Sequence, residues 1–122
     1  MKKLISILLL SIVSSLSFAA GDYDGIWQAE NTSVFATIHQ NEDSLVFVIL
    51  GADEWSALQG TLQGSQASLS KVTGSGNSIG LSVELQFESA TKLTLKVLTC
   101  NSIIENACDN LEDLEVLFGR IF

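Results

Sequence analysis

Ten consecutive residues alternate between apolar and small or polar side chains, and this alternation constrains the fold more than any other feature of the chain. Apolar residues occupy the odd positions from Ile79 to Phe87, and Gly, Ser, Glu or Gln occupy the even positions from Gly80 to Glu88. Because successive side chains of a strand point to opposite faces, the pattern predicts a strand with one buried face and one solvated face. Helical periodicity is nearly absent from the chain beyond residue 19.

Further runs of this kind are separated by turn-forming residues such as Asn, Asp, Gly and Ser. They predict strands at 24–30, 32–40, 44–51, 54–62, 66–73, 79–88, 91–100 and 114–122. Turn signals at such short intervals are typical of an all-β sandwich or barrel. We predict a single up-and-down antiparallel β-barrel of about eight strands. The run 44–51 is continuously apolar, which predicts a strand that is covered on both faces.

Residues 1–19 have the features of a signal peptide. Lys2 and Lys3 precede an apolar stretch that ends in the small-x-small sequence Ser17-Phe18-Ala19. We therefore expect a signal peptide at 1–19, one β-barrel domain at 20–122, and export to the periplasm or the extracellular space of a bacterium. The apolar stretch spans only about ten residues, so we expect no stable membrane span.

The charge of the predicted mature chain excludes some partners. Without the two lysines of the signal, four basic residues remain against 14 acidic ones, a formal charge of −10. Binding to nucleic acid or to anionic lipid needs Lys and Arg to neutralise phosphates. We therefore expect no nucleic-acid partner.

Cys100 and Cys108 are the two cysteines of the chain. In an exported protein such a pair predicts a disulfide, because those compartments are oxidising. The spacing fits no common zinc or redox motif, and we expect no metal ion and no cofactor. The segment 103–113 has apolar residues at helical spacing, and a short helix and a plain loop both remain open there.

Three residues near the ends of the chain predict how the barrel closes. Gly25 and Trp27 open the first strand, and Arg120 lies in the last strand on the same face as Val116 and Phe118. In a closed up-and-down barrel the first and last strands are neighbours. Arg120 could then stack on the Trp27 indole as a cation on an aromatic ring.

The chain has a Gly-x-Trp strand near its start and a basic residue, Arg120, in its last strand. In these features it resembles the calycins, which include the lipocalins and the shorter avidin-type barrels. The resemblance implies a β-barrel in which Gly25, Trp27 and Arg120 serve closure. It also implies the possibility of a carrier for a small apolar ligand. The only tryptophans are Trp27 and Trp55, too few for the biotin cage of the avidins, so the resemblance transfers no ligand site.

Candidate binding residues lie elsewhere. Trp55 follows a turn and could be an exposed anchor for a partner, because tryptophan is enriched at interface hot spots; a half-buried core position is the alternative. Acidic residues crowd the disulfide region, where Glu105, Asp109, Glu112 and Asp113 are the candidates. Their spacing matches no EF-hand, so a solvated acidic face is the alternative to a site.

We expect no enzyme. His39 is the only histidine, and no local nucleophile or orienting group accompanies it. We predict instead a non-catalytic binding protein that docks a basic protein such as a lysozyme or a protease. The alternative is a calycin-like carrier of a small apolar ligand. A small outer-membrane barrel, suggested by the C-terminal Phe122, has Arg120 on the lipid-facing side against it.

Overall fold

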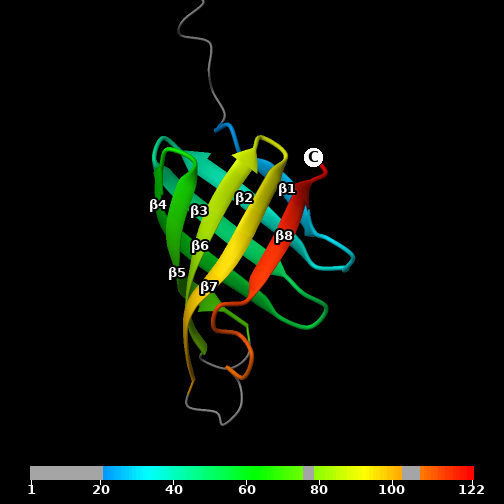
Figure 1. The fold of residues 1–122 in the computed structure, drawn as a ribbon, viewed down its shortest axis with the longest axis vertical. Helices are drawn as coiled ribbons and strands as arrows, with labels where there is room; N and C mark the ends of the chain where they lie inside the picture. Colours follow the sequence, from blue (N-terminus) through cyan, green and yellow to red (C-terminus); the bar gives the residue numbers. More distant parts are fainter. Residues whose placement is uncertain (1–20, 76–78, 103–107) are drawn as a thin grey trace, which may run out of the picture.

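Eight antiparallel strands form a closed barrel in the computed structural model of the protein (Figure 1). The structure describes residues 21–75, 79–102 and 108–122. Each strand pairs with the next one, and β8 pairs with β1. The strands are β1 (Gly25–Ala29), β2 (Phe35–Asn41), β3 (Ser44–Leu50), β4 (Trp55–Gln63), β5 (Gln66–Gly74), β6 (Ile79–Ser89), β7 (Lys92–Ser102) and β8 (Glu115–Arg120). The predicted up-and-down barrel is confirmed; the predicted signal peptide lies outside the described residues.

The predicted strand boundaries agree with the observed ones to within a few residues. The largest difference is at β2, which begins at Phe35 and not at residue 32. The Thr32 hydroxyl donates to the Ala29 carbonyl (3.0 Å) and accepts from the Val34 amide (3.1 Å), so Thr32 closes a turn. Of the ambiguous segment 103–113, residues 108–113 form turns, and residues 103–107 lie outside the described part.

Buried apolar side chains from all eight strands occupy the barrel interior. They include Trp27, Ile38, Phe47, Leu58, Leu69, Leu85, Leu93 and Phe118. Two pairs of rings meet edge to face, Trp27 with Phe87 at 5.9 Å and Phe47 with Phe118 at 5.6 Å between ring centroids. Within β6, Val83, Leu85 and Phe87 are buried and Leu81 packs partly buried against the core, which confirms the predicted alternation from residue 81 to residue 87. The side chain of Ile79 lies outside the described part. The interior is therefore a packed core.

The outer face of β3 is not covered, which corrects the prediction for residues 44–51. Leu45 and Phe47 point into the core, but Val46 and Val48 on the outer face are only half-buried and Leu50 is exposed. Neighbouring strands pair with β3 edge to edge and leave this face bare. The prediction assumed that a second layer of structure covers the outer face of this apolar run, and no such layer lies among the described residues.

The strand directions divide the connections between the two ends of the barrel. At one end β1, β3, β5 and β7 finish, and the described connecting residues there are 30–34, 51–54, 75 and 108–114. At the other end lie the short connections 42–43, 64–65 and 90–91, with the segment 21–24 and the C-terminus (Figure 1). In the described part of the chain, no helix has the length and hydropathy needed to cross a membrane.

Candidate functional site

One end of the barrel is strongly acidic, and we call it the acidic end. The described residues of its connections (30–34, 51–54, 75 and 108–114) include six Asp or Glu residues and no Lys or Arg. Glu30, Asp53 and Glu54 are exposed, and so are Asp109, Glu112 and Asp113. Glu105, which was also a candidate, lies outside the described residues. The topology thus gathers acids that are up to 83 positions apart in the sequence.

Trp55 stands at this end with its indole on the outer wall, and 41% of the residue is exposed. Its backbone is fixed on both sides. The amide donates to the Ser75 hydroxyl (2.8 Å) and the carbonyl accepts from the Ser75 amide (3.0 Å). The turn before it is closed by the Gly51 amide, which donates to the Glu54 carbonyl (2.8 Å). Trp55 is therefore an exposed ring on a rigid backbone.

Two further apolar side chains flank Trp55, and we call the three together the apolar row. Phe35 pairs with Leu50, and Leu50 pairs with Trp55, so the three lie side by side on β2, β3 and β4. Phe35 is 36% exposed and Leu50 is 42% exposed. The sequences of β1 to β4 contain no charged residue. The apolar row is therefore an uncharged strip of wall that ends beside the acids of the connections 30–34 and 51–54.

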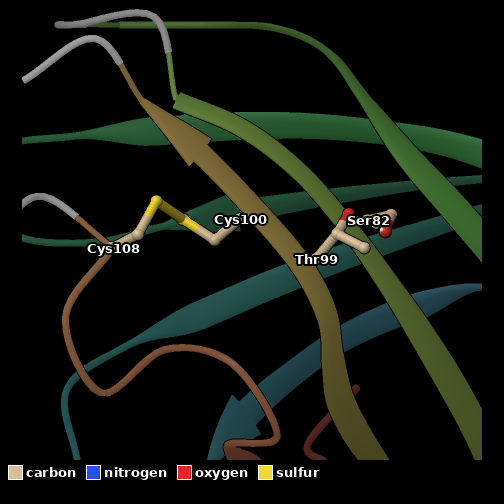
Figure 2. The surroundings of a disulfide bond; sticks show 4 residues. All are labelled: Ser82, Thr99, Cys100 and Cys108. Atoms are coloured by element: carbon tan, nitrogen blue, oxygen red, sulfur yellow. Dashed lines mark hydrogen bonds between the residues drawn. A yellow bond between two sulfur atoms is a disulfide. The ribbon is translucent and has the colours of Figure 1, made fainter.

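The connection between β7 and β8 is tied to the barrel wall. Its Cys108 forms the predicted disulfide with Cys100 of β7, with 5.7 Å between the two Cα atoms (Figure 2). Backbone hydrogen bonds join Val97 to Leu114 (2.9 Å) and Asp113 to Val97 (3.0 Å). Leu111 packs against the core. The described acids of this connection, from 109 to 113, are thus carried on an anchored segment.

At the opposite end, the predicted closure residues lie at the junction of β1 and β8. Trp27 is the register partner of Arg120 and is fully buried. The Arg120 guanidinium donates to the carbonyl oxygens of Asp22 (3.1 Å), Phe122 (3.2 Å) and Asp24. Its partners in the structure are thus backbone carbonyls, and the ring that meets the Trp27 indole is Phe87.

Gly25 is required by its backbone. Its φ of 147° lies in a region that residues with a Cβ rarely adopt. A Cβ at this position would also collide with the Phe122 carbonyl oxygen. The chain terminus therefore packs directly on Gly25, where β1 begins.

The segment 21–24 closes this end of the barrel. The Tyr23 ring stacks on Phe87 with 3.7 Å between centroids, and the Tyr23 carbonyl accepts the Trp27 indole N–H (3.1 Å). The Asp24 carboxylate accepts a hydrogen bond from the backbone N–H of Gln40 (2.6 Å). Asp24 thus serves the structure, and together with Arg120 it holds this segment across the barrel end.

His39 is exposed on the outer face of β2, opposite Val46 of β3. No three His, Cys, Asp or Glu side chains within the described ranges gather closely enough to hold a metal ion. We take the apolar row with its neighbouring acids as the candidate site.

Comparisons with family models, with curated proteins and with solved structures each gave no match. The candidate site is therefore defined by the geometry of this chain alone. Of its residues, the sequence identified Trp55 and the acids of the disulfide region. It missed Phe35 and Leu50. The continuous apolar run of β3 was a signal for Leu50, because such a run gives the strand an apolar outer face as well as an apolar inner one.

Proposed function

We propose that this protein is an exported, non-catalytic binding protein that docks a basic protein through the apolar row and the acidic end. One observation carries the proposal. Phe35, Leu50 and Trp55 form an exposed, uncharged strip that ends at Glu30, Asp53 and Glu54. An apolar centre with a charged rim is the usual composition of a protein interface.

The two parts of this surface have different roles in binding. Aromatic side chains in a fixed position provide most of the affinity, since they bury a large area and lose little conformational entropy. Trp55, with its backbone bonded to Ser75, meets this description. The acids attract a cationic protein over a longer range and raise its association rate, an effect that salt screens.

The two alternatives have less support. The calycin resemblance favours a carrier of a small apolar ligand, but buried side chains from all eight strands occupy the space such a ligand would need. A membrane-spanning barrel turns apolar side chains outward to the lipid. In this barrel β6 turns Ser82, Glu84 and Gln86 outward, whereas Val83 and Leu85 are buried.

The test compares two exposed aromatic residues at opposite ends of the barrel. Trp55→Ala removes the centre of the proposed site, and Phe122→Ala removes a ring that is 82% exposed at the C-terminus. The probes are a cationic lysozyme and trypsin, each titrated against immobilised protein by biolayer interferometry. We expect Trp55→Ala to raise the Kd about 30-fold, the effect of a hot-spot residue worth about 2 kcal/mol.

We expect Phe122→Ala to leave the Kd unchanged. If wild-type protein bound neither probe, or if Trp55→Ala bound as tightly as wild type, the proposal would be wrong. Because Trp55 lies on the surface, near-UV circular dichroism of both variants should match the folded wild type apart from the missing ring.

A further inference from the structure

An open groove lies on the outer wall beside the apolar row. It has a volume of about 560 Å³ and runs between the β1–β2 connection and β8; Gln28, Glu30, Asn31, Phe35, Gly119 and Ile121 are among the residues that line it. The Gln28 side chain donates to the Thr32 carbonyl (2.8 Å), which holds the connection in place as one side of the groove. The groove is thus formed by bonded secondary structure.

Gly119 opens the floor of this groove. It lies on the face of β8 that points away from the buried Phe118. A Cβ built at Gly119 meets no atom within 4 Å, so nothing fills the space above it. Its backbone has no positive φ, and a larger residue could therefore occupy this position without strain.

The groove is continuous with the apolar row. Gly119 pairs with Gln28, Gln28 pairs with Phe35, and the row goes on from there to Leu50 and Trp55. Neighbouring strands lie about 4.8 Å apart, so the line from β8 to β4 extends about 19 Å across the wall. Phe35 belongs to both features, which makes one connected surface of them.

We infer that this groove receives an apolar side chain from a protruding loop of the same basic protein that docks on the apolar row. The inference rests on the proposed function and extends it to a second contact region. A recess beside a row of exposed apolar side chains can receive an anchoring side chain that protrudes from a partner.

The charges around the groove define the chemistry of that loop. Glu30 and Arg120 are the charged residues that line the groove, and its floor residues Gln28 and Gly119 are uncharged. The Arg120 guanidinium donates to the carbonyls of Asp22, Asp24 and Phe122, whereas Glu30 is exposed. Lys92 is the register partner of Gly119 on β7 but is not among the lining residues. A loop with an apolar side chain next to a Lys or Arg would place its cation beside Glu30. A loop that carries an apolar side chain next to a Lys or Arg is expected on the surface of a basic protein.

The experiment fills the groove and leaves the apolar row intact. Gly119→Trp places a large ring over the floor, and Gly119→Leu is a smaller second variant that disturbs the fold less. Ser68→Trp is the matched control, since Ser68 is exposed on β5, across the barrel from β1. Each variant is titrated with the cationic lysozyme and with trypsin, and its folded state is checked by thermal unfolding.

We expect Gly119→Trp to weaken the binding of a probe at least 30-fold, Gly119→Leu to weaken it to a smaller extent, and Ser68→Trp to change it less than twofold. Wild-type affinity in both folded Gly119 variants, while Trp55→Ala weakens binding as expected, would overturn the inference about the groove and leave the proposed function standing. Wild-type affinity in the Gly119 variants and in Trp55→Ala would overturn both.

Discussion

Phe87 packs in the core of the barrel and also contacts the segment 21–24, which closes the end of the barrel opposite the acidic end. Truncating Phe87 therefore tests whether the interior is packed as described. The residue is 3% exposed. Its ring lies 3.7 Å from the Tyr23 ring and 5.9 Å from the Trp27 ring between centroids. Phe87→Ala leaves a void between these two rings and removes both aromatic contacts.

The expected loss follows from these contacts. Truncating a buried phenylalanine to alanine costs about 3–5 kcal/mol, which contains both the lost transfer free energy and the cavity. Each aromatic pair contributes about 0.5–1.5 kcal/mol beyond its buried area, and this places Phe87→Ala in the upper part of the range. Phe122→Ala, which truncates a ring that is 82% exposed, should cost less than about 0.5 kcal/mol.

Urea unfolding of the disulfide-bonded protein, followed by tryptophan fluorescence, measures both free energies. The midpoint should fall strongly for Phe87→Ala and stay near wild type for Phe122→Ala, with similar slopes in urea. A loss below about 1 kcal/mol for Phe87→Ala would refute the reasoning, because truncating a ring in a packed core lowers the free energy of unfolding by more than that. An interior that tolerates the loss would be loose enough to strengthen the carrier alternative.

Two further predictions concern the ends of the barrel. Arg120→Met keeps an aliphatic side chain but removes the hydrogen bonds to the carbonyls of Asp22 and Asp24; it should cost about 1–3 kcal/mol and speed amide exchange at Tyr23, and unchanged exchange there would contradict the described role. Neutralising the exposed acids of residues 109–113 to Asn and Gln should slow association with the cationic lysozyme about tenfold at low salt and change it little at high salt. Neutralising Glu42 and Asp43 at the opposite end is the control, compared per charge removed because 109–113 hold three acids and 42–43 hold two. Equal slowing per charge at both ends would contradict a localised acidic site.

The fold was largely predictable because the information for it is local. The alternation from Ile79 to Glu88 specifies which side chains face the core, and turn residues mark where each strand ends. The boundary at Phe35 was not predictable in this way, since Thr32 closes a turn through its side chain although its β propensity fits a strand.

The candidate site was only partly predictable, because strand register brings its members together. Trp55 stands out as a tryptophan after a turn, whereas Phe35 and Leu50 look like ordinary core residues in the sequence. Their common row depends on the pairing of β2 with β3 and of β3 with β4. The groove at Gly119 had no sequence signal, since it depends on how the connection 30–34 lies beside β8.

Arg120 illustrates a similar limit at the closure of the barrel. Its place on the inner face followed from the alternation of β8, and its pairing with Trp27 followed from closure. Its hydrogen-bond partners, the carbonyls of Asp22 and Asp24, did not follow from the sequence. Every residue has a backbone carbonyl, so the sequence gives no sign of which carbonyls a guanidinium will meet. A cation on an aromatic ring was therefore the natural sequence hypothesis, although the guanidinium bonds to carbonyls.

The central claim is that an acidic protein with an exposed apolar row docks a basic protein. Isothermal titration of the wild-type protein with the cationic lysozyme and with trypsin, at low and at high salt, tests it most directly. We predict a saturable one-to-one complex with at least one probe, and an affinity that falls as salt rises but does not vanish, because the apolar row is not screened. Heats that never saturate, or binding lost entirely at high salt, would contradict the claim and indicate non-specific attraction between opposite charges.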